Sequence, residues 1–156
     1  MKRSLLSGIL MVTAILFLIA EPVVRADVKG KIVGDPQWWC SSFVLQRGAT
    51  LTVTVTVQNT GDRDYTFWVG LSFRSAYGKI YDVKPKSISL SSGLFGFGAK
   101  GPVTFSWTIP QDFPAATSGY DGSLEMTVAL WLGYSGGYMQ DELDRWGWEY
   151  IGTVQT

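Results

Sequence analysis

Histidine is absent from this 156-residue chain, and cysteine and asparagine occur once each, as Cys40 and Asn59. Without an imidazole to transfer protons near neutral pH, a hydrolase of the Ser-His-Asp or Cys-His type is excluded. A single cysteine also excludes a disulfide within the chain, so packing alone has to stabilise the fold. Cys40 lies between Trp39 and Ser41 without a partner base, which favours a small buried side chain over a reactive thiol.

An excess of charge of one sign is lacking as well. The chain has 13 basic and 13 acidic side chains, and residues 27–156 retain ten basic and twelve acidic ones, because residues 1–26 hold three basic and one acidic. No basic field therefore attracts nucleic acid. Asp121, Asp141, Glu142 and Asp144 lack the ordered spacing and turn glycine of a calcium loop. We interpret them as solvated charges and expect neither a metal nor a cofactor.

Residues 1–26 have the layout of a secretory signal. Lys2 and Arg3 precede a mostly apolar run over residues 5–20, and small residues precede Asp27. This layout predicts an N-terminal hydrophobic helix, export, and a secreted or surface-anchored product. The run is shorter than the roughly 20 residues of a spanning helix, which favours cleavage before Asp27 over retention as an anchor. A pilin-type leader, cut close to the N-terminus, is a third alternative.

Short segments with alternating apolar and polar side chains predict strands throughout residues 27–156. They cover residues 51–58, 66–74, 79–83, 87–91, 103–109, 124–132 and 148–154. Pro85 is expected to end the third of them, residues 93–98 form a glycine-rich loop with two aromatic side chains, and residues 139–146 form a helical turn. Seven or eight strands predict one all-β domain, an antiparallel immunoglobulin-like sandwich, with a single closed sheet as the alternative.

The turn after the first long strand contains Asn59 and Gly61. Asn tolerates left-handed backbone geometry and Gly allows a positive φ, so both residues are typical of such a turn. We therefore expect the chain to reverse here and to enter the next strand at once.

The segment Gly48-x-x-Leu-Thr-Val-Thr-Val-Thr-Val-Gln-Asn-Thr-Gly-Asp62 resembles the opening of CARDB-type modules, which are immunoglobulin-like domains of bacterial and archaeal surface proteins. Phe67-Trp68-Val69 and the segments 103–110 and 124–132 follow in the order that such modules show. The resemblance covers about residues 46–134 and implies the fold, a surface location, and adhesion or binding. The end of this chain, residues 141–148, departs from the acidic, Asn-rich ending that is frequent in the family.

Two tryptophans are the main candidates for ligand contact. Alternation places Trp68 and Trp131 on the faces opposite the apolar stripes, and their strands are expected to be neighbours in one sheet. Their rings would then form an outer patch that stacks on a sugar or a partner. We favour the alternative that residues 36–44 fold across and cover them. Trp148, next to Gly147, is a third candidate ligand-binding residue.

These observations lead us to expect an exported, non-enzymatic structural or adhesion module of the cell surface, whose exposed aromatic side chains and strand edges make contacts. A carbohydrate-binding module is the first alternative, and a subunit of an extracellular filament or virion is the second. The expected partners are other surface proteins or glycans, not nucleic acid. Residues 5–20 would tether the module to a membrane if they are retained, and self-association stays open.

Overall fold

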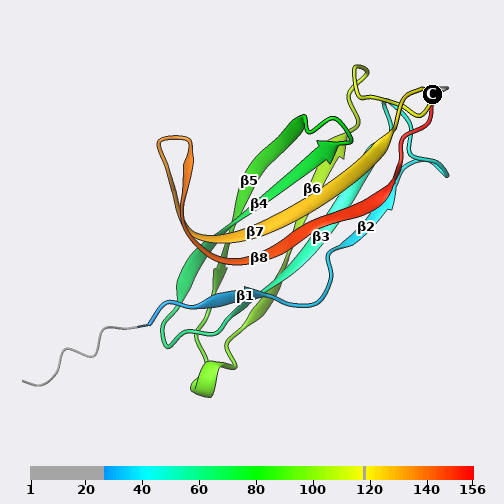
Figure 1. Ribbon diagram of the computed structural model, residues 1–156. Coiled ribbons are helices and arrows are strands. Elements are labelled where there is room, and N and C mark those ends of the chain that lie inside the picture. Colours follow the sequence, from blue (N-terminus) through cyan, green and yellow to red (C-terminus); the bar gives the residue numbers. More distant parts are fainter. Residues whose placement is uncertain (1–26, 118) are drawn as a thin grey trace, which may run out of the picture.

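The computed structural model describes residues 27–117 and 119–156 (Figure 1). The expected N-terminal helix lies outside these residues. Within this part of the chain, no helix has the length and hydrophobicity needed to cross a bilayer. Leu94–Gly96 form a 3₁₀ turn, η1. The strands are β1 (Gly30–Ile32), β2 (Gln37–Cys40), β3 (Thr50–Asn59), β4 (Tyr65–Ser75), β5 (Ile80–Leu90), β6 (Lys100–Thr108), β7 (Ser123–Ser135) and β8 (Tyr138–Thr153).

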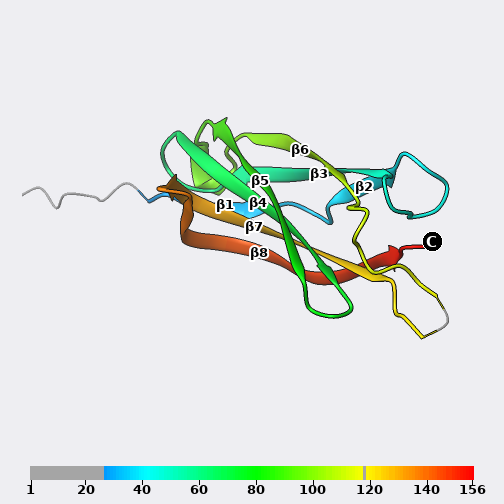
Figure 2. The same ribbon diagram turned by 90° about the horizontal axis from the view of Figure 1, so that it is seen from above.

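The strands form two four-stranded sheets that lie face to face (Figure 2). In the first sheet β3 pairs with β6 along one edge, and with β1 and β2 in succession along the other. The second sheet has the order β5-β4-β7-β8. Every pairing between these strands is antiparallel. The prediction of an all-β antiparallel sandwich is therefore confirmed.

The core is made by alternate side chains of the central strands, as the sequence pattern predicts. The fully or almost fully buried ones include Leu51, Val53, Val55, Val57, Phe67, Val69, Leu71, Phe73, Leu124, Met126, Val128 and Leu130. Trp107 of β6 is half-buried at the margin of this core, where its ring stacks on Phe73 with 4.1 Å between ring centroids. Among the residues that the structure describes, all buried core residues lie between residues 45 and 154.

Two local predictions are wrong. Pro85 does not end a strand, because β5 is an edge strand and Pro85 lies at a bulge where the β4–β5 register shifts between Val69 and Leu71. A bulge on an edge strand tolerates the missing N–H of proline. Residues 139–146 are not a helical turn, since they form the first half of β8 and pair with β7. Pairing with the long strand β7 stabilises the extended conformation more than the weak local pattern favours a helical turn.

The turn after β3 works differently from our expectation. Neither Asn59 nor Gly61 has a positive φ. The buried Asn59 amide instead donates to the carbonyl oxygens of Arg63 and Leu90 at 2.8 and 3.0 Å, and its Oδ1 accepts the Gly61 N–H at 2.9 Å. Gly61 lies against the backbone of Asp27, whose carbonyl oxygen would collide with an added Cβ. This turn therefore fastens the start of the described chain to the end of β3.

Candidate ligand-binding site

Trp68 and Trp131 face each other directly across β4 and β7, on the outer side of the β5-β4-β7-β8 sheet. Both side chains are half-buried. The ring of Tyr134 packs on Trp68, with 5.0 Å between the centroids and 39° between the planes. The structure thus brings together the two tryptophans that the sequence singles out, and it adds a third ring.

The expected cover by residues 36–44 is wrong. Residues 37–40 form β2, which pairs with β3 in the opposite sheet. The reason is that β3 has a free edge beyond β1, and β2 supplies its hydrogen bonds there. Trp39 consequently lies 59% exposed on the far side of the molecule from Trp68 and Trp131.

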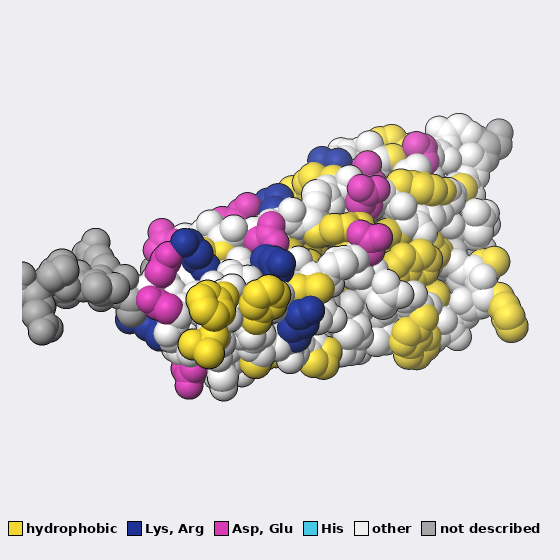
Figure 3. Space-filling model, turned by 90° about the horizontal axis from the view of Figure 1, so that it is seen from below, with side chains coloured by type: hydrophobic (Ala, Val, Ile, Leu, Met, Phe, Trp, Pro, Cys, Tyr) yellow, Lys and Arg dark blue, Asp and Glu magenta, His cyan; other side chains and the backbone are white. Residues whose placement is uncertain are grey.

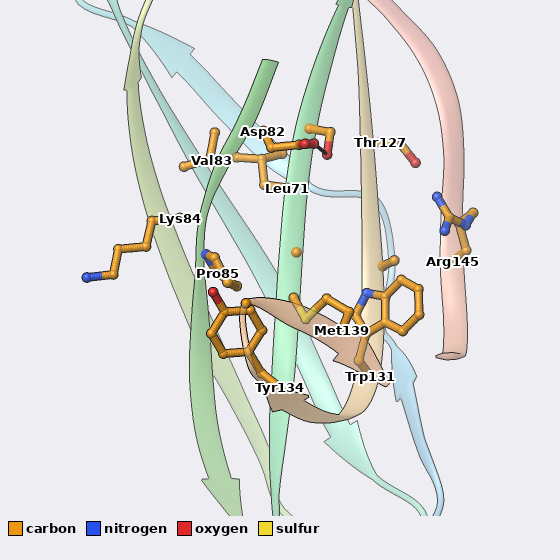
Figure 4. A pocket seen from close by; sticks show the side chains of 14 residues that line it. Leu71, Asp82, Val83, Lys84, Pro85, Thr127, Trp131, Tyr134, Met139 and Arg145 are labelled. Atoms are coloured by element: carbon orange, nitrogen blue, oxygen red, sulfur yellow. Dashed lines mark hydrogen bonds between the residues drawn. The ribbon is translucent and has the colours of Figure 1, made fainter. Parts of the chain in front are cut away.

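The partial cover comes instead from the tip of the β7–β8 hairpin, which curls across the outer face of its own sheet (Figures 1 and 4). The β7–β8 register shifts between Leu130 and Trp131, and Asp141 has a φ of 55°. Such a bulge bends a strand and increases its twist. Gly136 and Gly137 both have a positive φ, which is the backbone geometry of the tightest hairpin turns.

A cavity of about 420 Å³ opens between this tip and the sheet (Figure 4). Gly70 and Ala129 belong to its floor, and Trp131, Tyr134 and Met139 form an apolar wall. A Cβ added to Gly70 would lie 3.2 Å from Cε of Met139 and 3.6 Å from Nε1 of Trp131. Because Gly70 has no side chain, the space in front of Met139 and Trp131 stays open and the cavity is deeper there.

Polar groups line the other end of the cavity. The Ser72 hydroxyl donates to Oδ1 of Asp82 at 2.6 Å, and Thr127 lies on the neighbouring strand. Arg145 is ion-paired with Glu142. The hydrogen bond that the Arg145 guanidinium donates to this carboxylate raises the pKa of the guanidinium above its ordinary value. The site therefore combines aromatic faces with hydroxyl, carboxylate and guanidinium groups, and Arg145 stays charged at any ordinary pH.

A shallower hollow of about 630 Å³ adjoins the cavity. Its lining includes Trp68, Ser89 and Gln140, and it shares Tyr134 with the first cavity. The ring of Tyr134 thus separates two neighbouring hollows on one sheet face. This arrangement suits an elongated ligand better than a compact one.

Trp148 lies outside both hollows. The guanidinium of Arg74 is 4.4 Å from the centroid of its ring, and Arg74 is held by Glu125 at 2.6 Å. One face of Trp148 is therefore already occupied by a cation. The structure does not bring Trp148 together with Trp68 and Trp131.

Three of the four acidic residues considered as calcium ligands have structural partners, and for Glu142 this partner is Arg145. Asp144 accepts the backbone N–H of Ile32 at 2.7 Å and ties β1 to β8, while Asp121 accepts hydrogen bonds from Ser123, which lower its pKa. Among residues 27–117 and 119–156, no three His, Cys, Asp or Glu side chains are grouped so that they would hold a metal ion.

Sequence reasoning missed Gly70, Tyr134 and Met139 as site residues. Tyr134 lies beyond the end of the predicted strand 124–132, and Met139 was assigned to a helical turn, because the strand pattern fades after Leu132. The available signal was the Gly136-Gly137 pair between two tyrosines, which is typical of a tight β-hairpin.

No family model matches the chain, and no curated protein matches it. Solved structures share the fold. A calcium-binding mutant of Bacteroides uniformis β-glucuronidase 2 has a TM-score of 0.62 at 14% identity, with 80% of this chain and 14% of that chain covered. A β-glucosidase of Erythrobacter marinus has 0.51 at 21% identity, with 81% and 15% covered.

A further match is the alkylpurine DNA glycosylase AlkC of Pseudomonas fluorescens, bound to DNA with an abasic site analogue. It has a TM-score of 0.50 at 16% identity, with 84% of this chain and 31% of that chain covered. This chain therefore spans only a small part of proteins with different activities. At these identities the likeness shows the β-sandwich fold alone.

Proposed function

We propose that this chain is an exported, non-enzymatic immunoglobulin-like module of the cell surface, which adheres by binding carbohydrate on the outer face of the β5-β4-β7-β8 sheet. The observation that carries the proposal is the cavity under the β7–β8 tip, where Trp131 and Tyr134 face the polar groups of Ser72 and Asp82. The apolar faces of sugar rings stack on aromatic side chains, and their hydroxyls pair with carboxylates and hydroxyls.

The dimensions of the site agree with a glycan ligand. A volume of about 420 Å³ is within the range of roughly 300–1,000 Å³ in which small-molecule sites fall. The second hollow, on the other side of Tyr134, extends the binding face along the sheet. A short oligosaccharide would therefore place one unit against Trp131 and a neighbouring unit against Trp68.

Four observations support a surface module without catalysis. The leader layout of residues 1–26 is typical of exported proteins, and the absence of histidine removes the commonest proton-transfer group. The resemblance of residues 46–134 to CARDB-type modules suggests a surface location. Matches to a small part of large glycosidases fit a domain that acts as a module.

A glycan array probed with residues 27–156 tests the proposal. Trp131→Ala removes the stacking face, and Gly70→Leu fills the cavity toward Met139. We expect either change to weaken binding about tenfold or more. Trp39→Ala is the matched control, because that tryptophan is exposed on the opposite sheet. A silent array, or equal binding by the Trp131→Ala variant and the parent, would contradict the proposal.

A further inference from the structure

A second apolar surface surrounds the 3₁₀ turn η1, whose residues are not part of the lining of either hollow. Leu94, Phe95 and Phe97 are 82%, 94% and 81% exposed. Large apolar side chains are scattered over most protein surfaces, but three of them this exposed within four residues form a contiguous patch that calls for a partner. We call residues 94–97 the η1 loop.

The η1 loop is held in shape by backbone contacts. The N–H of Phe97 donates to the carbonyl oxygen of Leu94 at 3.2 Å. Gly93 and Gly98 pack so closely on neighbouring backbone that neither has room for a side chain. Phe95 has a φ of 57°, which is an unfavourable region for an aromatic residue. The fold thus maintains a strained backbone that directs an apolar side chain into solvent, which indicates a functional constraint.

The position of the η1 loop relates it to the start of the domain. The N–H of Asn59 donates to the carbonyl oxygen of Ala99, two residues after the loop, at 3.1 Å. On the same turn, the N–H of Asp62 donates to the carbonyl oxygen of Asp27, and the Asp27 N–H donates to the Asp62 carboxylate at 2.7 Å. Asp27 follows the apolar segment 5–20 in the sequence, and the start of the described chain lies at the same end of the sandwich as η1 (Figure 1).

The charges at this end are mixed. Asp27 is ion-paired with Lys29, and Asp62, Arg63 and Lys100 lie on the adjoining turn and strand. Figure 3 shows hydrophobic side chains gathered near this end, with side chains of both signs around them. This surface is therefore not a basic patch of the kind that attracts anionic headgroups. Its distinguishing property is exposed apolar area.

We propose that the η1 loop inserts into the interface of a lipid bilayer. The apolar segment 5–20 brings this end of the sandwich to a membrane during export, and Leu94, Phe95 and Phe97 then enter the boundary between headgroups and acyl chains. The contact fixes the orientation of the module on the membrane surface. This inference goes beyond the proposed carbohydrate binding, because it uses a different surface and a different ligand.

Sedimentation with phosphatidylcholine vesicles tests the inference on residues 27–156, which contain every core residue of the described part of the chain but not the apolar segment. The test variant combines Phe95→Asn, which tolerates the left-handed backbone, with Phe97→Ser. We expect it to lower the partition coefficient at least about tenfold. Phe43→Ser is the matched control, since Phe43 is fully exposed beyond the opposite end of β3, about 30 Å away. It should bind like the parent.

The dependence on lipid charge and salt separates insertion from electrostatic attraction. Insertion predicts similar binding to phosphatidylcholine vesicles and to vesicles with added phosphatidylserine, at low and at high salt. A Phe97→Trp variant gives a second readout, because an indole that enters the interface shifts its emission to the blue relative to the parent in the same titration.

Four results would overturn the inference. In sedimentation, these are no binding of the parent to either vesicle, equal binding by parent and test variant, and binding that requires anionic lipid and disappears at high salt. In fluorescence, it is an unshifted emission of the Phe97→Trp variant. Sedimentation velocity without lipid supplies a further one. If the parent forms a dimer that the test variant does not, the partner of the η1 loop is a second copy of the chain. Glycan binding by the test variant should equal that of the parent, so failure of one proposal does not imply failure of the other.

Discussion

Replacing Asn59 by alanine should destabilise the sandwich more than any other change of a single polar side chain in the turn after β3. The side chain of Asn59 is completely buried and makes three hydrogen bonds, to the carbonyl oxygens of Arg63 and Leu90 and from the N–H of Gly61. These bonds connect the end of β3, the turn and the end of β5. Alanine removes all three at once and leaves their partners in the interior.

The magnitude follows from the number and burial of these bonds. A typical hydrogen bond contributes about 0.5–1.5 kcal/mol net, and a buried group left without a partner costs about 1–3 kcal/mol. The bonds to Leu90 and Gly61 are buried, and the one to Arg63 is partly so. We therefore expect Asn59→Ala to lower the free energy of unfolding by about 3 kcal/mol, a large share of the roughly 5–15 kcal/mol of a typical domain.

Urea unfolding of residues 27–156, followed by tryptophan fluorescence, measures this loss. Asn59→Asp is the informative companion, because the carboxylate still accepts the Gly61 N–H but turns a second oxygen toward two carbonyl oxygens. At neutral pH it should lose at least as much stability as Asn59→Ala. If Asn59→Asp stays within about 0.5 kcal/mol of the parent, the hydrogen bonds are not the reason for an asparagine here, and the reasoning is refuted.

Three further predictions concern other parts of the sandwich. Trp107→Ala should lower the free energy of unfolding by about 3 kcal/mol in the same assay, since it removes the ring stacked on Phe73, and a loss below 1 kcal/mol would contradict this packing. Lys79→Met should raise the pKa of Asp112, which the hydrogen bond from Lys79 keeps below its ordinary value, and an NMR titration measures it. Because that pKa is lowered in the folded state, the stability from the pair is present above the unfolded-state pKa and is lost as the pH falls through the folded-state pKa. Trp148→Ala should leave glycan affinity within about twofold of the parent, because that ring lies outside both hollows.

The regular strands could be predicted because their side chains alternate without interruption. In β3 and β7 every second residue is apolar from Leu51 to Val57 and from Leu124 to Leu132. Burial follows the same period from Leu51 to Val57, whereas in β7 Thr127 and Ala129 of the outer face are buried as well. The same parity puts Trp68 and Trp131 on the outer face, so their adjacency followed once β4 and β7 were assigned to one sheet. A period of two is sufficient for this inference because it sets the inward face directly.

The irregular parts could not be predicted in this way, because each bulge changes the parity of the strand that contains it. β8 pairs with β7 through three register shifts, so its inward side chains, such as Leu143 and Trp146, do not follow one alternating pattern. The curl of the hairpin tip that brings Tyr134 and Met139 over Gly70 depends on these shifts. The hydrogen bond from the Asn59 amide to the carbonyl oxygen of Leu90 likewise joins two strands that are distant in the sequence.

The most direct test of the proposed function is an NMR titration of residues 27–156 with soluble glucan, mannan and N-acetylglucosamine oligomers, followed by the indole N–H signals of the tryptophans. Carbohydrate binding in the aromatic cavity predicts that the signals of Trp131 and Trp68 shift with a common affinity, while those of Trp39 and Trp148 stay in place. If no indole signal moves with any oligomer, or if Trp39 alone responds, the outer face of the β5-β4-β7-β8 sheet is not a carbohydrate-binding site.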